Sequence, residues 1–121
     1  MSNETMTSEE MRDLAIQALD DMKGIDILPM DVRSLTDITD FMIICTGRST
    51  RHVKALADNV AVKAKERHAS YVHLEGERES EWILVDLGDV VVHVMLAATR
   101  SFYSLEDLWE PVKEMRQQSH S

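Results

Sequence analysis

The sequence has a single cysteine and no hydrophobic run long enough to cross a membrane. One thiol, Cys45, cannot form an internal disulfide, and its place in the apolar stretch "FMIICTG" predicts a buried side chain rather than a nucleophile. A membrane-spanning helix needs about 18 consecutive apolar residues. The first residues, "MSNETMTSEEM", lack the basic start and apolar centre of a signal peptide. These absences predict a cytoplasmic protein with no membrane partner.

Positive charge is also scarce. The chain has 13 Lys and Arg against 22 Asp and Glu, which gives a formal net charge of −9. Nucleic-acid affinity comes largely from neutralised phosphates, so we expect no DNA partner and no broad nucleic-acid surface. A basic protein partner fits better, because complementary potentials speed encounter. One segment, residues 48–67, has a local surplus of positive charge, from Arg48, Arg51, Lys54, Lys63, Lys65 and Arg67. These residues form either a small anion-facing patch or, as we favour, the solvated face of a helix.

Two stretches have the apolar spacing of helices. The first begins after Thr7, which has the spacing of a capping box with Glu10, and Gly24 can end it. Ser49 is a suitable N-cap for the second, whose apolar stripe covers residues 53–64. Both helices therefore have one apolar face to bury.

Strand patterns lie between and after these helices. Residues 25–32 read as a strand in which Pro29, having no N–H, argues for an edge position or a bulge. The continuous apolar run 41–47 predicts a strand buried on both faces. Further expected elements are a strand at 71–75, the hairpin arms 82–86 and 89–95, and a helical end split near Pro111.

The resulting order, α-β-β-α-β-β-β-α, predicts one α/β domain over residues 1–121. Its sheet is expected to be mixed, mostly five-stranded and flanked by helices. We see no internal repeat, linker or low-complexity segment. Residues 1–6 and 117–121 are expected to be flexible tails.

The hairpin "EWILVDLGDVVVHVM" (81–95) combines a core pattern with a mixed one. A two-residue turn at Leu87-Gly88 would set 86 opposite 89, 84 opposite 91 and 82 opposite 93. One face is then aliphatic and belongs to the core: Ile83, Val85, Val90, Val92 and Val94. The other face mixes apolar and polar residues: Trp82, Leu84, Asp86, Asp89, Val91, His93 and Met95. This second face is either a protein interface or a surface covered by the C-terminal helices.

Two arrangements invite a catalytic interpretation. Gly47 and Ser49 lie at a strand-to-helix junction, which can favour phosphate, although a Gly before an N-cap Ser also simply begins a helix. Asp86 and Asp89 face each other across the expected turn, but no Asp-x-Asp pair puts two carboxylates on one sheet face, and His93 has no Ser or Cys partner at a recognisable spacing. We expect no catalytic residue, cofactor or metal. The alternative is a nucleotide-binding or nucleotidyltransferase enzyme that uses the Gly47-Ser49 turn and the hairpin carboxylates.

Three long stretches resemble the ribosomal silencing factor family, also called Iojap-like: "DVRSLTDITDFMIICTGRSTRHVKALADNV", "EGERESEWILVDLGDVVVHVM" and "RSFYSLEDLW". The resemblance runs from about Leu14 to Trp109 and implies a degenerate nucleotidyltransferase-like fold without catalysis. It also implies docking on the large ribosomal subunit through ribosomal protein L-fourteen, with at most a minor contact with ribosomal RNA. The bound factor would block the small subunit and repress translation under nutrient limitation. A homodimer of the free protein is compatible with this role.

The resemblance carries the expected docking residues onto this chain. Trp82 and Tyr103 would be aromatic anchors, and Leu87 and Met95 would fill adjacent hollows of the partner. Asp86 would pair with basic groups. The full partner-binding set is Trp82, Asp86, Leu87, Met95, Arg100 and Tyr103, with Glu75 at the rim.

Overall fold

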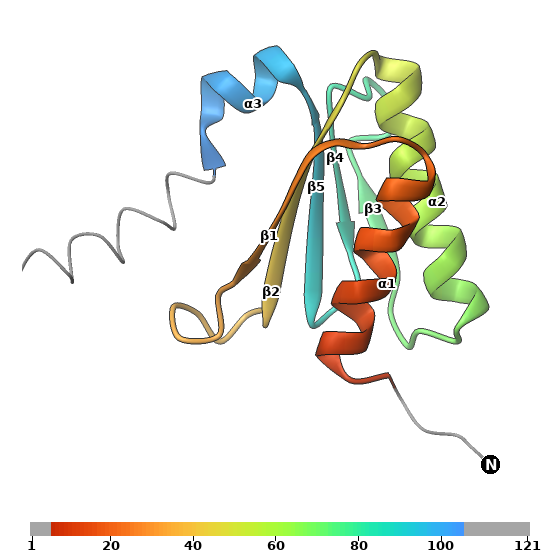
Figure 1. The fold of residues 1–121 in the computed structure, drawn as a ribbon, viewed down its shortest axis with the longest axis vertical. Helices are drawn as coiled ribbons and strands as arrows, with labels where there is room; N and C mark the ends of the chain where they lie inside the picture. The colour runs from red at the N-terminus through yellow and green to blue at the C-terminus, as the bar shows by residue number, and fades with distance from the viewer. Residues whose placement is uncertain (1–5, 106–121) are drawn as a thin grey trace, which may run out of the picture.

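A computed structural model describes residues 6–105. Five strands form one mixed sheet in the order β1-β2-β5-β4-β3 (Figure 1). The elements are α1 (Ser8–Asp21), β1 (Ile25–Asp31), β2 (Phe41–Gly47), α2 (Thr50–Glu66), β3 (His73–Glu75), β4 (Trp82–Asp86), β5 (Val90–Leu96) and α3 (Ala97–Tyr103). The predicted α/β architecture and element order are confirmed. The expected tail at 117–121 and the helix break at Pro111 lie outside the described residues.

Helix α1 begins and ends through local hydrogen bonds. The hydroxyl of Thr7 accepts from the N–H of Glu10 (3.0 Å), and the carboxylate of Glu10 accepts from the N–H of Thr7 (2.9 Å), so the predicted capping box is confirmed. The helix does not end in the way that was expected. Lys23 adopts the left-handed conformation (φ 63°), and Gly24 follows it. Gly24 is needed for space instead, because a Cβ there would lie 2.6 Å from the sulfur of Cys45.

Strand β1 lies at one edge of the sheet, as Pro29 predicts. It pairs antiparallel with β2 and carries an irregularity between Ile25 and Leu28, so the edge position and the bulge occur together. Strand β2 also pairs with β5, in parallel. All seven residues of β2 are buried, which confirms the prediction of a strand covered on both faces.

The predicted register of the β4–β5 hairpin is wrong by two residues. Trp82 pairs with Met95 and Asp86 with Val91, and the turn residues are Gly88 and Asp89. The N–H of Leu87 donates to the carbonyl of Val90 (2.8 Å) across this turn. Gly88 has a φ of 88°, and a two-residue turn with glycine first needs such a positive φ. A two-residue shift keeps every side chain on its face, so the predicted aliphatic face is correct.

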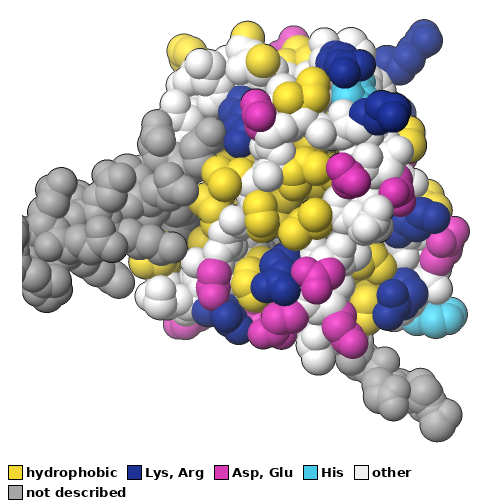
Figure 2. Space-filling model, viewed as in Figure 1, with side chains coloured by type: hydrophobic (Ala, Val, Ile, Leu, Met, Phe, Trp, Pro, Cys, Tyr) yellow, Lys and Arg dark blue, Asp and Glu magenta, His cyan; other side chains and the backbone are white. Residues whose placement is uncertain are grey.

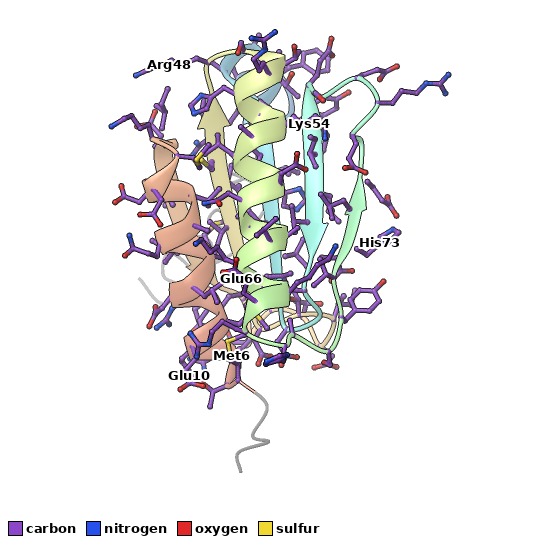
Figure 3. The ribbon with its side chains drawn as sticks, turned by 90° about the vertical axis from the view of Figure 1, so that its right-hand side faces the viewer. Met6, Glu10, Arg48, Lys54, Glu66 and His73 are labelled. Atoms are coloured by element: carbon purple, nitrogen blue, oxygen red, sulfur yellow. The ribbon has the colours of Figure 1, made fainter. Side chains whose placement is uncertain are left out.

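The principal core lies between the sheet and the two long helices. Helices α1 and α2 lie side by side on one face of the sheet (Figures 1 and 3). The predicted stripe of α2 is buried in full: Val53, Leu56, Ala57, Val60, Ala61 and Ala64. Met6 was expected in a flexible tail, yet its side chain packs against this core. Figure 2 shows hydrophobic side chains in the middle of one face of the molecule. Ile16, Pro29 and Met30 are among the residues that line a hollow of about 360 Å³ formed by α1, β1 and β2.

A second, smaller core lies on the opposite face of the sheet. Its buried members are Met30, Val32, Met42, Ile44 and Met95, and Leu28, Trp82 and Leu105 pack against them. Among the described elements, α3 is the only helix beside this face, whereas two helices cover the other (Figure 1). The mixed face of the hairpin is therefore covered less completely than the aliphatic one.

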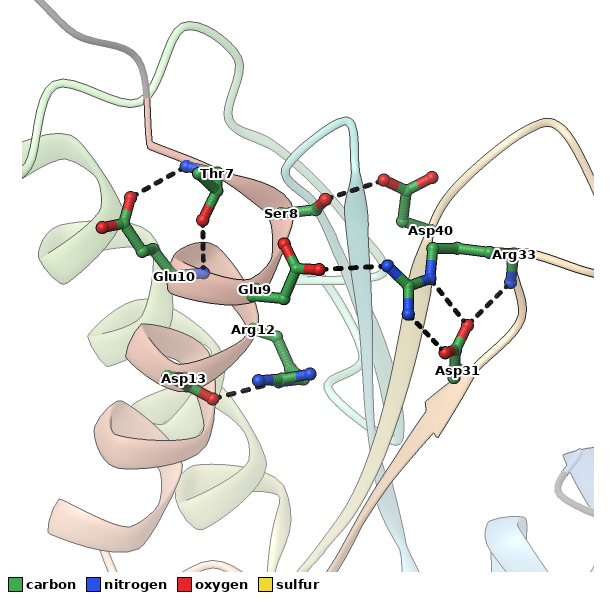
Figure 4. A network of polar contacts seen from close by, with 9 residues as sticks. All are labelled: Thr7, Ser8, Glu9, Glu10, Arg12, Asp13, Asp31, Arg33 and Asp40. Carbon is green, nitrogen blue, oxygen red and sulfur yellow. Dashed lines mark hydrogen bonds and ion pairs between the residues drawn. The ribbon is translucent and has the colours of Figure 1, made fainter.

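Ion pairs fasten the loop between β1 and β2 to the start of α1 (Figure 4). Arg33 bridges Asp31 (2.7 Å) and Glu9 (3.0 Å). The guanidinium carbons of Arg12 and Arg33 each lie 4.8 Å from the ring centroid of Phe41. Exposed ion pairs contribute at most about 1 kcal/mol each, so their role here is to orient the loop.

Replacing Thr7 with alanine removes the capping box of α1. We expect Thr7→Ala to lower the free energy of unfolding by about 1 kcal/mol, because the N–H of Glu10 loses its acceptor. Urea denaturation followed by circular dichroism measures the change. Thr50→Ala is the control, since Thr50 is exposed and Ser49 caps α2. Equal losses in both variants would contradict the prediction.

Candidate partner-binding surface

Trp82 and His93 join the two arms of the hairpin on its mixed face. The indole N–H of Trp82 donates to Nδ1 of His93 (2.9 Å), and the ring centroids are 5.8 Å apart. The indole N–H can only donate, so Nδ1 must carry its lone pair. His93 is 7% exposed, and burial lowers its pKa from 6.5 to about 4. It is therefore a neutral acceptor that fixes the orientation of Trp82.

A chain of aromatic rings leads from this buried pair to solvent. Trp82 contacts Tyr103 of α3 at a centroid distance of 4.9 Å. Tyr103 in turn packs edge-to-face on Phe102, also at 4.9 Å. Tyr103 is 53% exposed and Phe102 is 77% exposed. Exposed aromatic side chains next to a fixed one offer apolar area at low entropic cost, as binding surfaces require.

Carboxylates surround the aromatic rings. A hollow of about 190 Å³ beside Trp82 is lined by Gly76, Glu79, Glu81, Trp82, Thr99 and Tyr103. The turn that carries these glutamates closes through a bond from the N–H of Ser80 to the carbonyl of Gly76 (3.0 Å). Gly76 has a φ of 91°, and a Cβ there would lie 2.1 Å from the carbonyl oxygen of Trp82. Only glycine fits at this position, so the acidic rim is held tightly against the aromatic residues.

The structure brings some of the expected docking residues together. Trp82 and Met95 are register partners, and Tyr103 contacts Trp82. Arg100 is nearby, with Nη1 donating to the hydroxyl of Thr46 (2.9 Å), which pairs with Met95 in the sheet. Arg100 also donates to the carbonyl of Asp26 (2.8 Å), so it holds α3 to the start of β1.

Glu75 lies at the edge of this cluster, and Asp86 lies away from it. Glu75 is exposed on β3 opposite Leu84, and it contacts His73 (3.0 Å). Asp86 is at the far end of β4, roughly 13 Å from Trp82 along the strand. Its carboxylate accepts from the N–H of Gly88 (2.8 Å), which is the contact of a turn-forming residue.

Leu87 and Met95 do not lie on the surface, which corrects the expectation that they fill hollows of a partner. Leu87 is 4% exposed and belongs to the principal core beneath the helices. Met95 is fully buried in the second core. Met95 belongs to β5, and Leu87 directly follows β4 with its side chain in the core beneath α1 and α2.

The parts of the alternative enzymatic site lie at opposite ends of the sheet. Asp86 pairs with Val91, which is beside Met42, whereas Gly47 ends β2 roughly 16 Å further along. Packing explains why residue 47 is a glycine, because a Cβ there would lie 2.7 Å from the side chain of Val53. Asp86 and Asp89 are also not opposite each other, contrary to the expected register. Residues 6–105 contain no group of three or more His, Cys, Asp or Glu side chains placed to hold a metal ion.

Some features of this surface were missed by sequence reasoning. Glu79 and Glu81 lie in the stretch "GERESE", which has only the pattern of a charged turn, and Phe102 lies in the helical end expected after the hairpin. The tight fit of Gly76 under Trp82 links that turn to the aromatic residues, and no sequence pattern shows such a contact. The bond between Trp82 and His93 was predictable in principle, since both had been placed on one face of neighbouring strands.

Taken together, the mixed sheet with helices on one face and an aromatic, acidic surface on the other defines a small α/β protein that presents a surface rather than a walled cleft. No helix among residues 6–105 is long and apolar enough to cross a membrane. The model of the family described as "Ribosomal silencing factor during starvation" matches residues 5–121. The chain belongs to this ribosomal silencing factor family, which confirms the resemblance seen in the sequence.

Individual relatives agree with the family match. A ribosomal silencing factor of Chromobacterium violaceum is 52% identical over 104 residues, covering 86% of this chain and 85% of the relative. One from Bacillus subtilis is 39% identical and covers 86% and 88%. A crystal structure of a Chromobacterium violaceum protein superposes with a TM-score of 0.85 at 50% identity, covering 87% of this chain and 88% of the other. The family is named for a regulatory role.

His93 makes the stability of the fold depend on pH. The unfolded chain protonates this histidine near pH 6.5 and the folded chain near 4, so the unfolded state is favoured as the pH falls through that window. The contribution lost is roughly 3 kcal/mol, and it levels off below pH 4. We expect His93→Gln, which keeps an acceptor for Trp82, to flatten the pH dependence of denaturation midpoints. His73→Gln, at an exposed histidine, should leave the pH dependence of the parent; equal slopes in all three proteins would contradict this assignment.

Proposed function

We propose that this protein binds the large ribosomal subunit through ribosomal protein L-fourteen and prevents the small subunit from joining. The observation that carries the proposal is the exposed aromatic and acidic surface around Trp82 and Tyr103, in a chain of the ribosomal silencing factor family. A mouse relative, 35% identical over 100 residues, is named for mitochondrial assembly of the ribosomal large subunit. That name supports the large subunit as the partner.

The charges of the surface favour a basic protein. Proteins that bind ribosomal RNA carry surplus Lys and Arg, and this chain has a net charge of −9. Glu79 and Glu81 lie beside the aromatic rings, and Glu75 is exposed on the neighbouring strand β3. Such an arrangement suits a partner whose apolar patch is bordered by cations. The carboxylates steer the encounter, and the aromatic rings supply most of the binding energy.

The expected docking residues act in different ways under this proposal. Tyr103 contacts the partner directly, and Trp82 supports it from below. Arg100 fixes the position of α3, while Met95 and Leu87 stiffen the strands from within. A partner that reaches both Tyr103 and Asp86 must cover most of the length of β4.

The proposed mechanism is steric exclusion without turnover. A bound domain of 13.8 kDa occupies space that the small subunit needs, so translation is repressed. Under this proposal the repression takes place in the cytoplasm and under nutrient limitation. A homodimer of the free protein through the less covered face of the sheet is compatible with this function. Light scattering over a range of concentrations detects it.

Tyr103→Ala tests the docking surface. We expect at least about a tenfold loss of affinity for purified large subunits and for isolated L-fourteen, because an exposed aromatic anchor is removed. Co-sedimentation and surface plasmon resonance measure the two affinities. Tyr71→Ala is a matched control, since Tyr71 is 49% exposed and precedes β3.

The parent protein should also reduce the formation of complete ribosomes when it is mixed with large subunits before small subunits are added. Sucrose gradients read the result. If the parent bound neither large subunits nor L-fourteen, the proposed function would be wrong. If Tyr103→Ala and Tyr71→Ala bound equally well, the docking surface would lie elsewhere.

A further inference from the structure

Three cations lie together at the end of the molecule where α1 ends and α2 begins. Lys23 follows α1, Arg48 precedes α2, and Arg51 lies in its first turn. Figure 3 shows Arg48 extending away from this end, and Figure 2 shows Lys and Arg side chains grouped in its upper right corner. We name Lys23, Arg48 and Arg51 the basic end.

Only some of the cations on the surface take part in ion pairs. Four described cations, among them Lys54 and Lys63, contact carboxylates, whereas Lys65 and Arg67 do not. Among residues 6–105, none of the three cations of the basic end lies within 4 Å of a carboxylate. Arg48 and Arg51 share this property with Lys65 and Arg67, and they differ from them in lying at the N-terminus of α2.

The helix dipole makes Arg48 and Arg51 unfavourable where they are. The N-terminus of a helix carries partial positive charge, which acidic residues stabilise and cations destabilise. Helix α1 follows this rule, with Glu9 and Glu10 in its first turn. Helix α2 has no acid in its first turn. Lys23 follows the C-terminus of α1, where a cation is favourable. Only the two arginines are therefore placed against the helix dipole. Residues that oppose local stability in this way are expected at functional sites.

Two hollows meet at Arg48. One, of about 420 Å³, is lined by Asp21, Met22, Lys23, Arg48, Ser49 and His52. Its walls are fixed, because His52 contacts the carbonyl of Met22 (2.8 Å), and Asp21 accepts from Gln17 (2.9 Å). The other, of about 750 Å³, runs from Arg48 to α3, and its polar lining includes Asp26, Thr46, Arg100, Ser101 and Ser104.

Two backbone N–H groups at this helix start already have acceptors. The N–H of Arg48 donates to Nδ1 of His52 (2.9 Å), and the N–H of His52 donates to the hydroxyl of Ser49 (3.1 Å). The groups that a ligand would meet at this end include the cationic side chains and nearby hydroxyl groups. Long, exposed arginines suit the phosphates of an extended backbone, which they contact in two-pronged fashion.

We propose that the basic end contacts backbone phosphates of ribosomal RNA while the aromatic surface holds the ribosomal protein. This inference rests on the proposed function and adds a second partner to it. The hollow beside Arg48 reaches Ser104, which follows Tyr103, so the two contacts form one continuous footprint across α3. A chain with a net charge of −9 is repelled by RNA in general. A local group of unpaired cations lets it lie against an RNA-rich surface in one orientation.

The salt dependence of large-subunit binding tests the proposal. Each phosphate contact adds about 0.7 to 0.9 to the slope of log affinity against log salt, so Arg48→Gln/Arg51→Gln should lower the slope by about 1.5. We also expect about a tenfold loss of affinity at low salt. Lys65→Gln/Arg67→Gln, at the other end of α2, is the control with the same change in charge, and it should keep the slope of the parent.

Thermal unfolding separates this effect from misfolding. Removing two cations from the N-terminus of α2 should leave the Tm of the double variant unchanged or raise it. A lower Tm together with weaker binding would assign the arginines to folding and overturn the proposal.

A tethered cleavage reagent locates the contact directly. Cys45 is fully buried, and burial raises its pKa to about 11, so an iron chelate attaches only to an introduced cysteine. Arg51→Cys should cut large-subunit RNA at a defined place, and Arg67→Cys should give weaker cuts. The RNA contact is wrong, and the proposed function stands, if the parent binds subunits but the parent and both double variants have the same salt slope, and if reagents at positions 51 and 67 cut the RNA equally or not at all. If the parent does not bind, both are wrong.

Discussion

Strand β2 has no side that faces water, and the rest of the fold follows from that constraint. Its seven residues, Phe41–Gly47, need a partner strand on each edge and cover on each face. Because β2 and β5 are parallel, the chain must cross over between them, and α2 lies on that crossover. Helices α1 and α2 then cover one face. The other face is closed by a methionine-rich cluster, and Trp82 lies at its margin.

That difference between the two faces is the origin of the candidate binding surface. Trp82 is held from below by His93 and from the side by Tyr103, so it is ordered without being fully buried. Burial keeps the pKa of His93 near 4, and the ring stays neutral at physiological pH. The same buried pair therefore stabilises the second core and shapes the surface above it. Packing and binding are not separate tasks at this point of the sheet.

The sequence predicts elements well where one local pattern decides the outcome. The capping box of α1, the buried run of β2 and the apolar stripe of α2 all appear as expected, because each depends on neighbours in the chain. The hairpin register was wrong because Gly88 was taken as the second turn residue, although a positive φ also suits the first. Helix α3 begins at Ala97, directly after β5, with no side-chain cap to announce it.

The site was harder to predict than the fold, since it depends on contacts between distant segments. Alternation shows that Met95 and Trp82 share a face, but it does not show that one is buried and the other reaches the margin. Likewise, Gly76 brings Glu79 and Glu81 beside Trp82 through a backbone fit that composition does not reveal. The counts of charged residues predict a net negative charge, but they do not show where on the surface the cations gather. The unpaired arginines before and within the first turn of α2 become visible only when every neighbouring carboxylate has been placed.

The two edges of the sheet limit how this protein can associate. β1 carries Pro29 and an irregular pairing, and β3, at the opposite edge, is three residues long. Proline, bulges and short strands all prevent another chain from adding its own strand to an exposed ladder of hydrogen bonds. Growth of the sheet into a polymer is thereby blocked at both ends. An acidic protein can then keep aromatic side chains exposed for a partner without offering other copies a template for aggregation.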